Sequence, residues 1–187
     1  MPSTEDKTPS CYWDACIFLH YVNATPDYLS VLDTLVDEAE QERVKVYTST
    51  LSVAEVAFGQ SEQAEGRLDA EIEAKIDGLW HPGSFVQPLQ ELHFFIVRSA
   101  RDINRAILSK RGNGHGIKAA DAIHLASAKR LKVGEFHTTD KKLLALQNEM
   151  GAELTSILDF TICEPNAKDR LIFPSSESGK AAEAEPS

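Results

Sequence analysis

The chain has 187 residues, of which 42% are hydrophobic and 26% charged, a balance typical of one globular domain and unlike that of a disordered or fibrous protein. Its apolar runs are far shorter than the ~20 residues that span a bilayer, and residues 1–10 are polar, so we expect no membrane helix, no signal peptide and a cytoplasmic protein. Three cysteines without a CxxC spacing argue against a zinc ribbon or a disulfide framework.

The net charge of −10 argues against a simple basic nucleic-acid-binding protein, but the charge is unevenly distributed. Residues 1–97 hold five bases against 17 acids, whereas residues 98–142 hold eleven bases against four acids, a local charge of +7. Two interpretations remain open for this basic segment: a solvated helix surface that balances acidic helices elsewhere, or a local surface for a polyanion.

Apolar spacing and turn residues predict short strands that alternate with longer helices. Residues 11–13 together with 17–19 are expected to form a buried strand, with Asp14 at its end. Thr25-Pro26-Asp27 is typical of a helix start, because Thr caps, Pro suits the first turn and Asp favours the helix dipole. The apolar repeat that follows predicts a helix to about residue 41.

The same signals predict the rest of the chain. Further helices are expected from Ser49 or Thr50 to Gly59 and over residues 62–79, 90–110, 118–131 and 140–149. Further strands are expected over 44–48, 133–138 and within 153–162, with a candidate short edge strand over 85–88. This alternation implies an α/β fold with a mostly parallel central sheet and helices on both faces. The domain is expected over residues 11–165, between a disordered extension (1–10) and a mostly disordered tail (166–187).

Four carboxylates are expected at the carboxyl ends of these strands, where open parallel sheets bind ligands. Asp14 and Asp140 follow strands directly, Glu55 lies about one turn into the helix after the second strand, and Asp121 lies in the first turn of its helix. Each alone could be a capping or surface acid. Together they would raise one another's pKa unless a divalent cation neutralised them, and oxygen ligands favour Mg²⁺ or Mn²⁺ over zinc.

Four segments carry a resemblance to a known family: WDACIFL (13–19), STLSVAEV (49–56), ADAIHLASA (120–128) and HTTD (137–140). They are similar to the four signature motifs of PIN-domain ribonucleases, and the combination most resembles the VapC-like toxins of bacterial toxin–antitoxin pairs. The resemblance covers about residues 11–163 in the right order. The sequence departs from the pattern at Cys16, where the family often has Asn or Ser, which puts a hydrogen bond from that position in doubt.

The resemblance implies a PIN-like three-layer α/β/α fold and a Mg²⁺- or Mn²⁺-dependent endoribonuclease that leaves 5′-phosphate and 3′-hydroxyl ends. Asp14, Glu55, Asp121 and Asp140 would be both catalytic residues and metal ligands, with Thr138 as the active-site hydroxyl. The basic segment would then follow the RNA backbone, with Arg98, Arg101, Arg105 and Lys118 as candidate contacts. The implied partners are RNA, an antitoxin protein and a second copy of the chain. The amphipathic helices 26–41 and 62–79 also favour such a homodimer.

Several alternatives stay open. His124, three residues after Asp121, could be a ligand or general base, although its apolar stripe favours a structural hydrogen bond. The whole chain could instead be a catalytically inactive PIN-like binding module or a free-standing RNA-processing nuclease. A phosphotransfer domain of the haloacid-dehalogenase or receiver type is less well supported, because the first of these needs an Asp at the position of Cys16.

Overall fold

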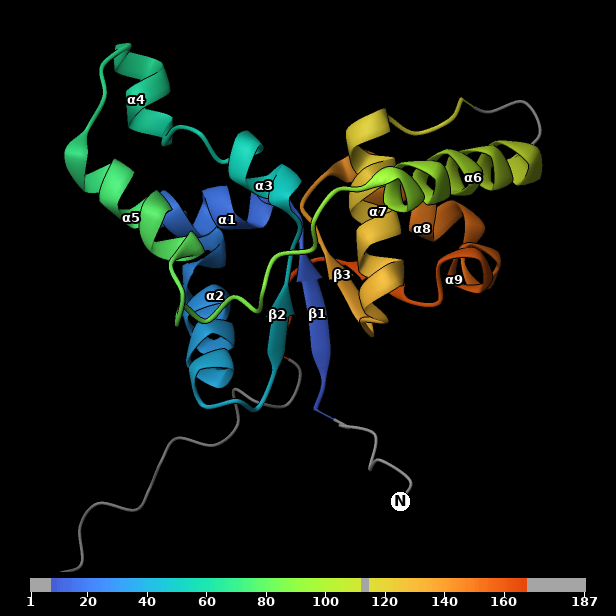
Figure 1. Ribbon diagram of the computed structural model, residues 1–187, viewed down its shortest axis with the longest axis horizontal. Helices are drawn as coiled ribbons and strands as arrows, with labels where there is room; N and C mark the ends of the chain where they lie inside the picture. The colour runs from blue at the N-terminus through green and yellow to red at the C-terminus, as the bar shows by residue number, and fades with distance from the viewer. Residues whose placement is uncertain (1–7, 112–114, 168–187) are drawn as a thin grey trace, which may run out of the picture.

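The computed structural model describes residues 8–111 and 115–167 (Figure 1). In chain order the elements are β1 (Ser10–Trp13), α1 (Ala15–Val22), α2 (Pro26–Glu40), β2 (Lys45–Tyr47), α3 (Thr50–Glu55), α4 (Gln60–Glu65), α5 (Ala70–Trp80), α6 (Phe94–Arg111), α7 (Ala119–Leu131), β3 (Glu135–His137), α8 (Lys141–Met150), α9 (Ala152–Leu158) and β4 (Thr161–Cys163). None of these helices is long and apolar enough to cross a membrane. All three cysteines are free of disulfide bonds.

The four strands form one parallel sheet in the order β2-β1-β3-β4. Strands β1 and β3 are therefore neighbours although more than a hundred residues separate them, and Tyr12 pairs with Phe136. Because all strands run in the same direction, their carboxyl ends meet at one edge, the upper edge in Figure 1. This arrangement brings the residues that follow β1 and β3 side by side.

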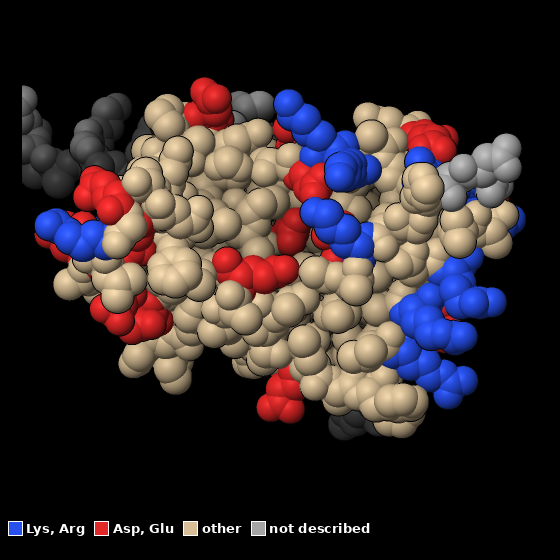
Figure 2. Space-filling view, turned by 90° about the horizontal axis from the view of Figure 1, so that it is seen from above, with Lys and Arg blue, Asp and Glu red and all other residues tan. Residues whose placement is uncertain are grey.

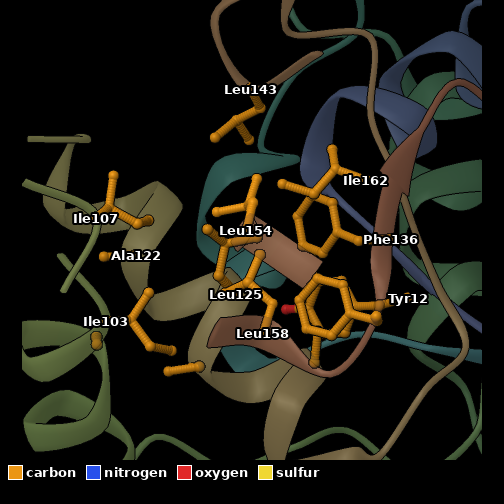
Figure 3. Close-up of a cluster of buried hydrophobic side chains, with 14 of the residues drawn as sticks. Tyr12, Ile103, Ile107, Ala122, Leu125, Phe136, Leu143, Leu154, Leu158 and Ile162 are labelled. Atoms are coloured by element: carbon orange, nitrogen blue, oxygen red, sulfur yellow. The ribbon is translucent and has the colours of Figure 1, made fainter. Parts of the chain in front are cut away.

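Alternation along the strands divides the buried side chains between two cores. Cys11, Trp13 and Val46 pack against α1, α2 and α5 on one face of the sheet. Tyr12 and Phe136, whose rings stack 5.2 Å apart, point into the other core, which α6, α7, α8 and α9 complete (Figure 3). Helices thus cover both faces, as Figure 1 shows, and the predicted α/β/α architecture with a parallel sheet is confirmed.

The expected strand over residues 17–19 is wrong. Asp14 has an extended backbone and its side chain accepts a hydrogen bond from the Ala15 N–H, so it caps helix α1 immediately after β1. Ile17 and Phe18 are then fully buried in that helix. The apolar sequence ACIFLHYV resembles a strand because α1 contributes more than one side to the protein interior.

The single helix expected over 62–79 is also wrong, because the chain forms α4 and α5 instead. Gly66 ends α4 in the left-handed conformation (φ +64°), which glycine adopts without strain. Asp69 then caps α5 by accepting hydrogen bonds from the backbone N–H groups of the first turn. Likewise the helix after Ser49 ends at Glu55, and Gly59 caps α4 rather than ending α3.

The remaining differences are small. Residues 85–88 form one isolated bridge, Val46↔Val86, rather than a strand, and residues 153–162 contain most of α9 and the start of β4. Residues 112–114 between α6 and α7, most of the expected N-terminal extension and most of the expected tail lie outside the described residues. The expectation that the two ends are disordered therefore stays a prediction.

Candidate active site

Asp14 is held by groups from the start of α1 and from the end of β3. Its Oδ1 accepts from the Ala15 N–H at 2.8 Å, and its Oδ2 accepts from the Thr138 hydroxyl at 2.8 Å. Its backbone N–H donates to the carbonyl of His137 at 3.1 Å, which continues the β1–β3 pairing past the end of the strand. The carboxylate is 14% exposed, so it is fixed in place and still reaches the sheet edge.

Thr138 connects two of the predicted acids. Its hydroxyl, which is fully buried, donates to Asp14 and accepts from the Asp140 backbone N–H at 3.0 Å. Asp140 in turn caps α8, because its side chain accepts from the Lys142 N–H at 2.7 Å. One threonine therefore fixes the spacing between Asp14 and the start of α8, which is a positioning role at the place where the sequence predicts an active-site hydroxyl.

Glu55 reaches the site through His124. The Glu55 side chain, 34% exposed at the end of α3, places Oε2 2.7 Å from His124 Nε2. His124 is 2% exposed, and its Nδ1 lies 2.7 Å from the Tyr12 hydroxyl, which donates to Ser49 Oγ at 2.9 Å. His124 Nε2 also lies 3.7 Å from Asp14 Oδ1. A chain of hydrogen bonds thus runs from the protein interior to Glu55.

His124 is the site residue whose surroundings the sequence predicted least completely. The sequence favours a structural hydrogen bond for His124, and its Nδ1 forms one with the Tyr12 hydroxyl. Its Nε2, however, faces the carboxylates of Glu55 and Asp14. Potential ligand atoms of Asp14, Glu55 and His124 all lie within 4.8 Å of one another. The position of His124 one helical turn after Asp121 was the available signal.

Asp121 joins the other acids electrostatically. Burial raises the pKa of the Asp121 carboxyl, and the charges of Asp14 and Asp140 raise it further, whereas Lys118 and His124 lower it. The negative charges of two of the other predicted acids therefore act on the Asp121 carboxyl group. Such an excess of negative charge is what a bound divalent cation would neutralise, and carboxylate oxygens are the donors that Mg²⁺ and Mn²⁺ prefer.

Cys16 provides the contact that the sequence put in doubt. Its thiol lies 3.5 Å from Asp14 Oδ2 and 3.4 Å from Thr138 Oγ1, and it accepts from the Thr139 N–H at 3.3 Å. Burial, followed by the charge of Asp14, raises the pKa of the Cys16 thiol. The group is thus a neutral, weak donor to the Asp14 carboxylate.

The four candidate RNA contacts are all exposed, and Lys118 lies close enough to Asp121 to lower the pKa of its carboxyl group. Arg98, Arg101 and Arg105 follow one another at helical spacing on α6, and Lys118 precedes α7. Arg101 and Arg105 line a cavity of about 540 Å³ between α6 and α7. Figure 2, which views the molecule from the side of the strands' carboxyl ends, shows acidic side chains gathered near the middle of this face with basic side chains next to them.

Comparison with known proteins gives one match. The family model of the PIN domain matches residues 11–148. This range includes all four predicted acids, Thr138 and His124. No curated protein and no solved structure matches the sequence significantly.

Proposed function

Because the chain belongs to the PIN-domain family, whose members are generally nucleases, we propose that it is a metal-dependent endoribonuclease. The observation that carries the proposal is the arrangement at the sheet edge. Asp14, Asp121 and Asp140 share one electrostatic environment there, and His124 links Glu55 to the same place. A carboxyl group such as that of Asp121, whose pKa is raised by burial and by neighbouring acids, is typical of a functional site rather than of a stabilising surface charge.

In this proposal Asp14, Glu55, Asp121 and Asp140 hold Mg²⁺ or Mn²⁺. When bound, the cation polarises the phosphodiester and lowers the pKa of a water molecule. Thr138 keeps the Asp14 carboxylate in position through its 2.8 Å hydrogen bond, and His124 does the same for Glu55. In-line attack by water leaves a 5′-phosphate and a 3′-hydroxyl.

The basic side chains supply the RNA surface in this proposal. Lys118, close enough to Asp121 to lower its pKa, is suited to a phosphate next to the cleaved bond. Arg98, Arg101 and Arg105 extend this positive surface along α6. Since the protein as a whole is acidic, RNA contact is expected on this side only.

An RNA cleavage assay with Mg²⁺, Mn²⁺ or EDTA tests the proposal. We expect metal-dependent cleavage that yields 5′-phosphate ends, and a loss of at least about 10- to 100-fold in Asp121→Asn, the loss seen even for residues that only support a metal ligand. Asp77→Asn, an exposed acid on α5, is the matched control and should cleave normally. Cleavage that persists in EDTA, or that survives in folded Asp121→Asn, would contradict the proposal. RNA binding without cleavage would favour the catalytically inactive binding module. Labelling of the protein by acetyl phosphate would favour the phosphotransfer domain.

The finer part of the proposal is that the protein is the toxin of a toxin–antitoxin pair. Besides the resemblance, support comes from exposed apolar side chains at the start of α6: Phe94 is 69% exposed, Phe95 72% and Val97 49%. Such a group is typical of a surface that a partner protein covers. We expect induced expression in a bacterial host to arrest growth, whereas Asp121→Asn should not. Unaffected growth would favour a free-standing RNA-processing enzyme.

The expected homodimer also stays a proposal. The apolar face of α2, which supported it in the sequence, is buried in the chain's own core through Leu32, Leu35, Val36 and Ala39. The remaining support for the homodimer is the family resemblance, because the exposed side chains at the start of α6 are the surface proposed for the partner protein. Light scattering should show a dimer at micromolar concentration, and a strict monomer would contradict this.

A further inference from the structure

Strands β3 and β4 carry a second group of potential metal ligands, apart from the acids at the sheet edge. Glu135 and His137 alternate with the core residue Phe136, so they lie on the opposite face of the sheet from it. Cys163 pairs with His137 across the β3–β4 ladder. Potential ligand atoms of Glu135, His137 and Cys163 all lie within 4.8 Å of one another.

Two buried polar atoms at this cluster have no hydrogen-bond partner within the described part of the chain. His137 is 1% exposed; its Nε2 lies 3.2 Å from Glu135 Oε2, but its Nδ1 has no hydrogen-bond partner among the described residues. Next to it, Asn166 donates to Cys163 Sγ at 3.5 Å, while its buried Oδ1 is likewise unsatisfied within the described part of the chain. Since buried polar atoms are nearly always paired, these two exceptions indicate that a water molecule or another polar group outside the described side chains completes this cluster.

The distances suit a small cation with tetrahedral coordination. With metal–ligand bonds of about 2.0–2.3 Å, neighbouring ligand atoms in such a site lie about 3.3–3.6 Å apart. The separation of 3.2 Å between Glu135 Oε2 and His137 Nε2 is close to this value. Small side-chain rotations would bring Cys163 Sγ to the same spacing from its present place within 4.8 Å.

We propose that Glu135, His137 and Cys163 form a second metal site that takes Zn²⁺. One thiolate, one imidazole and one carboxylate are the ligand types that Zn²⁺ combines, whereas Mg²⁺ binds oxygen alone. Binding requires the thiolate, so the Cys163 thiol releases its proton to solvent as the metal binds. Three protein ligands leave the fourth position to a water molecule.

The site ties β4 to the central part of the sheet. Among the strands that the structure describes, β4 lies at the edge of the sheet and pairs with β3 alone, over three residue pairs. A metal bound to Cys163 on β4 and to two residues of β3 crosslinks this short ladder. Zn²⁺ binding is therefore expected to stabilise the fold, independently of any RNA cleavage and of the acids at the sheet edge.

Titration of the full, reduced chain with Co²⁺, the spectroscopic substitute for Zn²⁺, tests the site. A Co²⁺–thiolate bond gives a charge-transfer absorption that carboxylate ligands do not give. We expect this band in the wild type, its loss on addition of Zn²⁺, and its persistence in excess Mg²⁺. The matched pair of variants is Cys163→Ser, which should abolish the band, and Cys16→Ser, which should keep it although Cys16 lies beside Asp14.

A melting curve provides the second measurement. Zn²⁺ at about 100 times its Kd should raise the Tm of the wild type and of Cys16→Ser by about 5–10 °C, and should leave Cys163→Ser unchanged. Should Cys163→Ser fail to fold, Glu135→Gln decides, because it should retain the band but need at least about 10-fold more Co²⁺. Any of four results would overturn the proposal. The wild type could show no band, or the band could survive in Cys163→Ser. The band could also be lost only in Cys16→Ser, or be unaffected by Glu135→Gln. Because no readout uses cleavage, this result is separate from the test of the nuclease.

Discussion

Substitution of Asp14 by Asn removes one negative charge from the site and keeps the shape of the side chain. Asn caps helices as well as Asp does, so the bond from the Ala15 N–H to Oδ1 is retained. At the other position an amide NH₂ replaces the oxygen that accepts from Thr138. The hydroxyl of Thr138 can then turn and accept from that amide, because its oxygen has two lone pairs.

The resulting change in stability without metal is small. Replacement of the charged hydrogen bond by a neutral one costs about 0.5–1.5 kcal/mol. Against this, repulsion within the site is relieved, since the charge of Asp14 raises the pKa of Asp121. We therefore expect the free energy of unfolding in EDTA to change by no more than about 1 kcal/mol, or about 2–4 °C in Tm.

With metal present the two proteins should differ clearly. At a Mg²⁺ concentration 100 times its Kd, the wild type gains about 2.7 kcal/mol of stability. Asp14→Asn should lose most of this gain, and RNA cleavage should fall with it. The pattern of equal stability in EDTA and unequal stability in Mg²⁺ distinguishes a metal ligand from a residue that only supports the fold.

The assay compares melting curves in Mg²⁺, Mn²⁺ and EDTA with RNA cleavage under the same conditions. Asp69→Asn is the matched control, because Asp69 also caps a helix, α5, and its side chain accepts hydrogen bonds from the backbone N–H groups of that helix's first turn. It should alter neither the metal response nor cleavage. Two results would refute the reasoning: unchanged cleavage by folded Asp14→Asn, or a large loss of stability in EDTA with cleavage reduced only by the unfolded fraction.

Three further predictions concern the surroundings of the site. Tyr12→Phe leaves His124 Nδ1 buried without its partner, so chemical denaturation should show a loss of about 1–3 kcal/mol, and an unchanged midpoint would contradict the hydrogen bond. Asp121 has a raised pKa in the folded state, so in EDTA its contribution to stability should decrease as the pH rises from about 3.8 through that raised value. In Asp121→Asn the free energy of unfolding should therefore depend less on pH over this range. If the wild type and the variant show parallel pH profiles of stability, the raised pKa is contradicted. Gly116→Ala would force a methyl group against the Asn104 amide, which holds the chain before α7 through hydrogen bonds with Ile117. The Tm should therefore fall by an amount equivalent to about 1–3 kcal/mol. An unchanged Tm would mean that the Asn104 side chain moves aside without cost.

The meeting of Asp14, Asp121 and Asp140 could be predicted from the sequence because it depends on few facts. Strands that alternate with helices form a parallel sheet, and parallel strands end at the same edge. An acid placed within three residues of the end of a strand, as Asp14 and Asp140 are, reaches that edge whatever the lengths of the connections. Errors of several residues in helix boundaries therefore did not affect this part of the prediction.

Features that depend on contacts through space could not be predicted in this way. The strand expected at residues 17–19 is a helix because Asp14 caps it, and an apolar helix in the interior has no amphipathic pattern to identify it. The pairing of His124 with Glu55 joins α7 to α3 across a sequence separation of 69 residues. Nothing in the periodicity of either helix indicates that contact.

Strand β3 shows why the two candidate sites need separate tests. Phe136 points into one core, Glu135 and His137 point to the other face with Cys163, and Thr138 directly after the strand holds Asp14. The His137 carbonyl also accepts from the Asp14 N–H, so a displaced His137 would move Asp14 as well. Loss of cleavage in a His137 variant would therefore not identify the site responsible. Cys163, on the far side of β3 from β1, is the ligand whose substitution separates the proposed zinc site from the acids.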